Sequence, residues 1–166
     1  MINIVLVEPE IPQNAGNIVR TCAAIGAKLY MVKPLGFIMD DKHFKRAGMD
    51  YLDFANVSVV DSFQEILDAN KNATFYYAST KSQNKYSDVT YPDGSFIVFG
   101  KESYGLSETI LKTNYDNCIR IPMNAKARSL NLSNSVAIIA YEAMRQQNFA
   151  ELKEYGELTG RPENDG

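Results

Sequence analysis

Short apolar runs alternate along the chain with stretches in which apolar residues recur every three to four positions. The apolar runs predict buried strands, and the three-to-four spacing predicts helices. Strands are expected at Asn3–Val7, Leu29–Val32, Val57–Val60, Ala73–Ala78, Phe96–Phe99 and Cys118–Ile121. Strands that alternate with helices predict an α/β fold, with a mostly parallel sheet covered by helices on both faces.

The helical stretches lie between and after these strands. Helices are expected from Asn17 to a stop at Gly26, over Asp40–Ala47, from Asp61 or Ser62 to Leu67, from an entry at Ser107, and over Ser133–Gln147. The last is the longest, and its apolar face carries Val136, Ile139, Ala140, Ala143 and Met144. In sheets of this kind, ligands bind beyond the carboxyl ends of the strands. The loops after Val7, Ala78, Phe99 and Ile121 are therefore the expected ligand-binding loops.

The length and charge of the chain limit both its domain count and its partners. The 166 residues fit a single domain, expected at residues 1–150, followed by a flexible acidic tail at 151–166. The net charge is −3, and five acids against two bases fall in the tail, which leaves 15 of each in the body. Because the body has no basic excess, RNA contact would have to come from local clusters or from a dimer surface.

Several classes of function are not supported by the residues. Cys22 and Cys118 lie far apart and His43 is the single histidine, so no zinc or haem site is expected and no metal is predicted. The first residues lack a basic flank, and no apolar run approaches the ~20 residues of a membrane span. We expect a cytoplasmic protein without a membrane partner.

Familiar catalytic and nucleotide-binding motifs also fail. The segment GKES at residues 100–103 lacks the earlier glycine of a phosphate-binding loop, because position 95 is Ser95, and Glu102 stands where a magnesium ligand would be needed. Neither GxGxxG nor GxSxG occurs in the chain. We expect His43 to be exposed or to face a phosphate rather than to act in catalysis.

Three segments have more polar groups than simple connections need. In the first, NAGNIVRTCAA at 14–24, the asparagines and glycine also fit helix capping, which is our expectation for Asn17. Arg20 lies one turn further among apolar residues, so we expect it to face a cleft. The second is FGKESYGL at 99–106, which also fits a strand-to-helix connection. The third, at 121–146, contains IPMNAKARSLNLSNS and has more amide and hydroxyl groups than one helix N-terminus requires.

Together these segments resemble the SPOUT methyltransferases. The similarity begins at NIVLVEPEIPQNAGNIVRTCAA, continues through KPLGFIMDDKHFKRAGMDY and ends at SLNLSNSVAIIAYEAMRQ. Within this class the chain is similar to the TrmH-like RNA 2′-O-methyltransferases, and most of all to the small TrmL- or YibK-like group that modifies the tRNA wobble nucleotide. The resemblance covers nearly the whole chain except the acidic tail.

The resemblance implies a deep trefoil knot near the C-terminus and S-adenosylmethionine as methyl donor, with S-adenosylhomocysteine as product. It implies 2′-O-methylation of the ribose at position 34 of the anticodon loop, on cytidine or a modified uridine. The residues that match the cofactor-binding loops are Ala78, Ser79, Thr80, Gly100, Ile121, Met123, Ser129 and Leu130. The residues that match the catalytic positions are Asn14, Arg20, Glu102 and Asn131.

Each catalytic candidate has an expected role. Arginine is a poor general base because it stays protonated, so we expect Arg20 to hold the adjacent phosphate and to stabilise a developing alkoxide. Asn14 would orient Arg20 or the ribose, and Glu102 would pair with Arg20 or anchor its loop. Asn131, with Ser129, would hold the donor and the substrate sugar. Helix capping remains the alternative for Asn131.

The partners follow from the same resemblance and from the basic residues. Phosphate contacts are expected first from Lys42, His43, Lys45 and Arg46, and nearer the site from Lys81, Lys85, Lys126 and Arg128. The resemblance implies a homodimer in which Ser133–Gln147 and the first helix pack across the interface, with Tyr141 there. Two alternatives stay open: an enzyme of the same family acting on rRNA or another tRNA position, and a non-catalytic α/β nucleotide-binding module.

Overall fold

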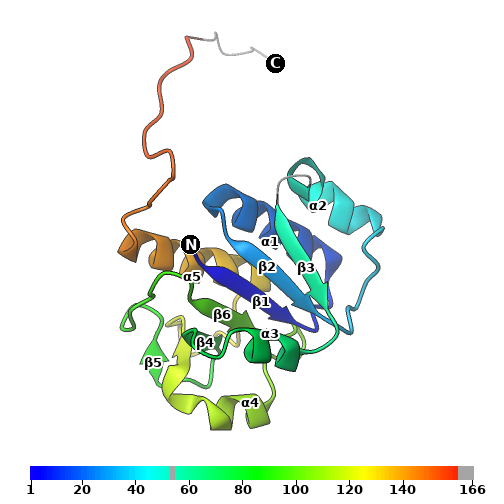
Figure 1. The fold of residues 1–166 in the computed structure, drawn as a ribbon, viewed down its shortest axis with the longest axis vertical. Coiled ribbons are helices and arrows are strands. Elements are labelled where there is room, and N and C mark those ends of the chain that lie inside the picture. The colour runs from blue at the N-terminus through cyan, green and yellow to red at the C-terminus, as the bar shows by residue number, and fades with distance from the viewer. Residues whose placement is uncertain (53–54, 161–166) are drawn as a thin grey trace.

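A computed structural model describes residues 1–52 and 55–160, and in this part of the chain the strands form one sheet (Figure 1). The strands are β1 (Asn3–Val7), β2 (Lys28–Val32), β3 (Asn56–Val60), β4 (Phe75–Ala78), β5 (Asn84–Lys85), β6 (Phe96–Phe99) and β7 (Cys118–Arg120). Their order is β3-β2-β1-β6-β4-β7-β5, and all neighbouring pairs are parallel. The predicted parallel α/β fold is confirmed, and the trefoil knot stays a prediction.

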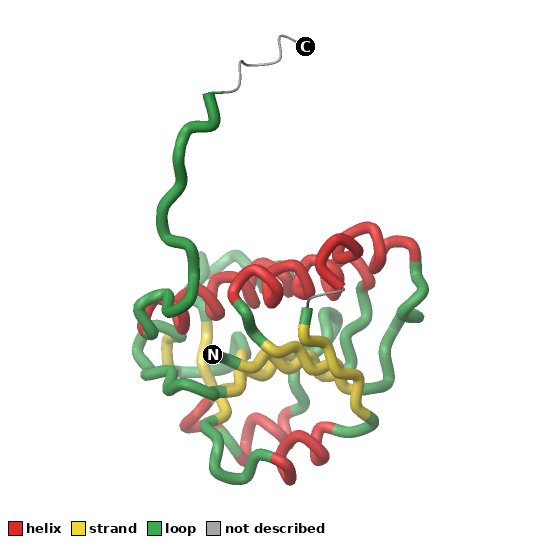
Figure 2. Tube along the Cα trace, turned by 45° about the horizontal axis from the view of Figure 1, so that its top comes forward, coloured by secondary structure: helices red, strands yellow, loops and turns green. Residues whose placement is uncertain are grey.

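Helices cover both faces of the sheet (Figure 2). They are α1 (Pro12–Ile25), α2 (Lys42–Leu52), α3 (Phe63–Ala69), α4 (Glu108–Thr113) and α5 (Leu132–Gln146), with a 3₁₀ turn at Tyr115–Asn117. Alternate residues of β1 face opposite sides: Ile4 and Leu6 pack in the core beneath α1 and α5, whereas Val5 packs with residues of α3 and α4. Since both faces of β1 are buried, its sequence is a continuous apolar run.

Local sequence signals place three of the helix ends. Gly26 ends α1 in the left-handed conformation, with φ 68°. Ser62 and Glu65 form a reciprocal capping box at α3, and the Ser107 side chain accepts from the Ile110 N–H at α4. These three boundaries were expected from the sequence and are confirmed.

The beginning of α1 differs from expectation. The helix starts at Pro12, five residues before Asn17, and its N-cap residue Ile11 makes no side-chain hydrogen bond. Proline suits the first helical position because its fixed φ is helical and its missing N–H has no partner there anyway. The capping interpretation of Asn17 is wrong: Asn17 is an exposed residue in the second turn, and the buried Asn14 faces the site.

Two further elements depend on tertiary packing. Helix α2 runs to Leu52 rather than Ala47, and it crosses α1 at two glycines. A Cβ at Gly16 would lie 2.5 Å from the Ala47 Cβ, and one at Gly48 would lie 3.0 Å from the Gly16 carbonyl oxygen. Strand β5 has no apolar run and was not predicted; it pairs with β7 at the edge of the sheet.

The segment after α5 leaves the body of the molecule (Figure 1). Residues 153–160 belong to no helix or strand and are exposed, and residues 161–166 of the expected tail lie outside the described residues. Across the described ranges, none of the helices combines the length and the hydropathy needed to cross a membrane.

Candidate functional site

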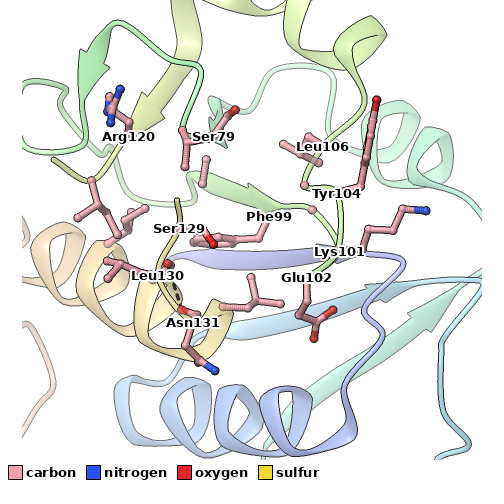
Figure 3. A pocket seen from close by; sticks show the side chains of 18 of the residues that line it. Ser79, Phe99, Lys101, Glu102, Tyr104, Leu106, Arg120, Ser129, Leu130 and Asn131 are labelled. Atoms are coloured by element: carbon pink, nitrogen blue, oxygen red, sulfur yellow. Dashed lines mark hydrogen bonds between the residues drawn. The ribbon is translucent and has the colours of Figure 1, made fainter. Parts of the chain in front are cut away.

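A pocket opens where β6, β4 and β7, which are neighbours in the sheet, reach their carboxyl ends (Figure 3). We call it the strand-end pocket; its volume is about 470 Å³, within the range of small-molecule sites. Its walls come from four segments distant in sequence: the start of α1, the residues after β4, the loop 100–106 after β6, and the loop 121–131 between β7 and α5. Parallel topology brings these segments together.

The residues that match the family's cofactor-binding positions meet in this pocket. All eight line it: Ala78, Ser79, Thr80, Gly100, Ile121, Met123, Ser129 and Leu130. Residues 121–131 form no helix or strand, so their peptide groups are outside the sheet ladder, while Ile119, Leu106 and Ile139 supply buried apolar surface. A pocket with polar loop backbone on one side and aliphatic side chains on the other can hold a flat, partly polar ligand.

The loop 100–106 folds back tightly on Gly100. Lys101 and Gly105 form an isolated antiparallel bridge, and Gly105 has φ 74°, a conformation that favours glycine. A Cβ on residue 100 would overlap the backbone of Gly105 and Leu106. Gly100 is therefore required by this close approach, which sets the shape of one pocket wall.

Glu102 joins this loop to the beginning of α1. Its carboxylate accepts hydrogen bonds from the Glu10 N–H at 2.8 Å, the Ile11 N–H at 3.1 Å and the Asn14 Nδ2 at 3.2 Å. These backbone groups precede a helix that has no side-chain cap of its own. Of the two expected roles for Glu102, the anchor is the one observed; no ion pair with Arg20 is present among the described residues.

Two carboxylates from the residues between β1 and α1 bind the loop 100–106. Glu10 accepts from the Ser103 N–H at 2.9 Å and from the Ser103 Oγ at 2.7 Å, and Glu8 pairs with the Lys101 Nζ at 2.9 Å. We call Glu8, Glu10 and Glu102 with these partners the carboxylate clamp. The hydrogen bonds from Ser103 lower the pKa of Glu10, and the bond to Glu8 raises the pKa of Lys101. Because the pKa of Glu10 is depressed in the folded state, its hydrogen bonds with Ser103 stabilise the fold at neutral pH. This stabilisation is lost as the pH falls through that pKa.

Two asparagines connect the clamp with α5. The Asn131 Nδ2 donates to the Asn14 Oδ1 at 3.0 Å, while the Asn131 Oδ1 accepts from the Ser133 and Asn134 N–H groups as the N-cap of α5. In Figure 3 the side chains of Glu102 and Asn131 lie on the side of the pocket nearest α1. Asn131 therefore caps a helix and lines the pocket at once, and the chain Glu102–Asn14–Asn131 links the three polar segments.

Arg20 does not join this group within its own chain. It lies on α1 beyond Asn14, it is exposed, and it does not line the strand-end pocket. Its guanidinium carbon lies 5.0 Å from the centre of the Tyr51 ring of α2, a cation–π geometry. Within the single chain Arg20 therefore faces solvent and α2, so the expected cleft is not formed by its own subunit, and the site role of Arg20 stays a prediction.

Most of the predicted RNA-binding residues form two surface groups. Lys81 and Lys85 lie apart from both: Lys81 lines the pocket and pairs with Glu108 at 3.0 Å, and Lys85 is in β5. Lys42, His43, Lys45 and Arg46 lie in the first turns of α2, where Lys45 pairs with Asp40 at 2.8 Å. Lys126 and Arg128 are exposed on the loop 121–131 beside the pocket. The His43 Nδ1 lies 3.6 Å from an Asp41 oxygen, and no cluster of three or more metal-ligating side chains occurs within the described residues.

The sequence analysis did not identify Glu10 and Ser103, which bind each other in the clamp. It also did not identify three residues that line the pocket: Tyr104, Arg120 and Ser135. The motif FGKESYGL contained Ser103 and Tyr104, but nothing in the sequence pairs Ser103 with a residue 93 positions away.

The clamp predicts an unequal effect of two glutamates on stability. Glu102→Ala removes the acceptor from three donors and is expected to lower the free energy of unfolding by about 2 kcal/mol. Glu108→Ala is the matched control, because Glu108 makes exposed ion pairs with Lys81 and Lys112 that contribute little. Urea unfolding of both variants measures the difference. Equal losses would contradict the anchoring role of Glu102.

Comparison with known proteins identifies the relatives of this fold and site. Residues 1–141 match the SpoU rRNA Methylase family. The chain belongs to the SpoU methylase family. A protein of Listeria monocytogenes serotype 4b is 51% identical over 153 residues, 90% of each chain. The tRNA (cytidine(34)-2′-O)-methyltransferase of Escherichia coli K12 is 43% identical over 150 residues, 90% of this chain and 96% of the relative.

Solved structures of SpoU methylases share the fold. A structure described as giving insights into 2-OH methylation of C/U34 on tRNA has a TM-score of 0.85 and 40% identity, covering 89% of this chain and 97% of that one. The SpoU methyltransferase AviRb of Streptomyces viridochromogenes, in complex with AdoMet, has a TM-score of 0.78 and 26% identity, covering 88% and 60%. The resemblance noted from the sequence is confirmed.

Proposed function

We propose that this SpoU methylase transfers a methyl group from S-adenosylmethionine to the ribose 2′-hydroxyl of the wobble nucleotide, position 34, of tRNA. The target is cytidine or a modified uridine. The observation that carries the proposal is the strand-end pocket, where the eight residues at the family's cofactor positions meet Asn14, Glu102 and Asn131. Relatives named for this reaction cover nearly the same length of chain, which supports the same substrate.

The pocket fits the donor. Leu106, Ile119 and Ile139 can cover the faces of an adenine ring, and the irregular backbone of 121–131 can hydrogen-bond its polar edge. When bound, S-adenosylmethionine supplies a methyl group on a sulfonium that leaves as the thioether of S-adenosylhomocysteine. Since the leaving group is already activated, the protein's task is to align the ribose oxygen in line with the methyl carbon and to help remove its proton.

Different residues of the chain position the loops, contact the donor and the sugar, and bind the phosphate. The carboxylate clamp and the pair Asn14–Asn131 fix the loops, so that Ser129 and Asn131 face the donor and the sugar. We assign Arg20 to the phosphate beside the target ribose. There its charge favours the negative charge that develops on the 2′-oxygen as the hydroxyl proton is removed, and that is neutralised when this oxygen bonds to the methyl carbon. The guanidinium itself keeps its protons, so the hydroxyl proton passes to another acceptor.

Arg20 needs a second subunit for this role, because it does not line the pocket of its own chain. We propose a homodimer built on α1 and α5, which lie on one face of the sheet and are both in the same core. On α5, Ile138 is 37% and Tyr141 is 45% exposed, which is suitable for an interface. Such a dimer would bring Arg20 of one subunit to the pocket of its partner and would combine the basic groups of both. We propose a cytoplasmic location, which is in keeping with a tRNA substrate.

The test is methylation of tRNA transcripts with radiolabelled donor. We expect one methyl group per tRNA, on the ribose of nucleotide 34, where it blocks alkaline cleavage of the next phosphodiester bond. A tRNA carrying 2′-deoxycytidine at position 34 is the matched control and should accept none. Methylation of ribosomal RNA or of another tRNA position would favour the alternative target, and absence of donor binding in calorimetry would favour a non-catalytic module.

A further inference from the structure

An open apolar groove lies at the carboxyl ends of β2 and β3, outside the strand-end pocket. We call it the edge groove; its volume is about 650 Å³. Ile38 is 71% exposed, and Met39 and Val59 are each 37% exposed. Pro34, Leu35 and Phe37 complete its apolar surface. Apolar side chains gathered in one exposed hollow, rather than scattered singly, mark a site of interaction.

The edge groove and the strand-end pocket share one connecting loop. All strands are parallel, so both hollows lie at the side of the sheet formed by the carboxyl ends of the strands. They are on either side of the loop after β1. The Gly36 N–H donates to the Pro9 carbonyl at 2.9 Å, and a Cβ on Gly36 would lie 2.6 Å from the Cα of Glu10. On its other side, Glu10 holds Ser103 at the pocket wall. Residues 8–11 therefore lie between the pocket and the groove, and the carboxylates of this loop, Glu8 and Glu10, are bound by Lys101 and Ser103.

The segment that lines the groove leads into the basic first turns of α2, which begins at Lys42, three residues after Met39. The nearby acids are engaged: Asp61 pairs with Lys33 at 2.9 Å, Asp40 pairs with Lys45, and Asp41 accepts from the His43 N–H at 2.7 Å at the start of α2. Two exposed cations of α2, Lys42 and Arg46, have no carboxylate of the described residues within 4 Å. An apolar surface together with these two cations matches a nucleotide, whose base is a flat apolar face and whose phosphate is an anion.

From this arrangement we infer that the edge groove holds an unpaired base of the substrate RNA, a neighbour in the same loop as the methylated nucleotide. This inference rests on the proposed function and extends it to a second binding point. The C-terminal segment is a poorer occupant, because it begins on the other side of the sheet, at the amino ends of the strands. There the Met1 amino group lies 3.2 Å from the Oε1 of Gln147, directly after α5. The groove thus contributes to the affinity for the loop, while the pocket performs the chemistry.

The experiment uses the full chain and tRNA transcripts that carry 4-thiouridine at one anticodon-loop position at a time. We expect photocrosslinks from a position other than 34 to the peptide 33–46. The double variant Ile38→Ser, Met39→Ser should lose this crosslink and raise KM for tRNA about tenfold, which is typical of losing one base contact. Its kcat and its Kd for S-adenosylmethionine should stay within twofold. Leu158→Ser, which changes a fully exposed apolar residue of the C-terminal segment, is the matched control and should change nothing.

The outcomes separate this inference from the function on which it rests. If tRNA is methylated at position 34 while the double variant keeps its KM and no crosslink reaches 33–46, the groove does not bind RNA and the inference is overturned alone. If the double variant instead changes the sedimentation of the protein without RNA, the groove is a protein contact, and the inference is again wrong. If the wild-type chain methylates no tRNA, both proposals fail.

Discussion

Replacement of Gly100 by alanine is expected to weaken the binding of S-adenosylmethionine about a hundredfold. The added Cβ would overlap the backbone of Gly105 and Leu106, so the loop 100–106 would have to move away from the pocket. Overpacking at such a contact costs about 3 kcal/mol, and 1.4 kcal/mol corresponds to a factor of ten in affinity. Calorimetric titration with the donor measures the loss.

The matched control for this change is Gly156→Ala. A Cβ at Gly156 meets nothing within 4 Å and its backbone is outside the left-handed region, so the donor affinity should equal that of the wild type. Thermal unfolding of both variants shows whether the fold survives. A folded Gly100→Ala protein that binds the donor normally would show that the loop 100–106 is not part of the cofactor site.

The second large effect is expected from Arg20→Ala, which should lower the rate of methylation about 10²–10³-fold, the range seen when a group that stabilises developing charge is removed. The Kd for S-adenosylmethionine should remain within a few-fold, because Arg20 is assigned to the RNA phosphate and does not line the pocket of its own subunit. Single-turnover methylation of tRNA and calorimetry measure the two quantities. A normal rate of methylation would remove Arg20 from the mechanism.

Mixing subunits tests whether Arg20 acts across a dimer. A heterodimer of Arg20→Ala and Gly100→Ala chains has one intact pocket, on the chain that lacks Arg20, while the other chain supplies Arg20. If the arginine serves the partner's pocket, refolding the two inactive proteins together should restore activity, up to about a quarter of the wild-type level for random pairing and one working site in each mixed dimer. Activity should stay absent if Arg20 serves its own subunit or if the chain is a monomer.

The apolar runs predicted every described strand except β5, and they predicted the burial of most of them; β3, at one edge of the sheet, contains no buried residue. Four- and five-residue apolar runs such as Phe96–Phe99 predict strands buried on both faces, and the observed β6 has the same bounds and is fully buried. Single residues with local chemistry were equally reliable: Ser62, Ser107 and Gly26 end or begin helices through hydrogen bonds or backbone conformations that involve only near neighbours in sequence. The resemblance of three motifs to one family added the cofactor-pocket residues, which the structure gathers in one place.

The contacts between segments distant in sequence were determined by the tertiary structure alone. The start of α1 is held by Glu102, which is 91 residues from Ile11, so no local cap marks this helix end and the prediction of a cap at Asn17 is wrong. The outward direction of Arg20, the pairing of Glu10 with Ser103 and the short strand β5 also depend on partners remote in sequence. The spacing of hydrophobic residues and helix capping both depend on residues a few positions apart, so they can be predicted from a single sequence. The contacts that shape the site join loops at the edge of a parallel sheet, where neighbours are set by strand order and not by distance along the chain.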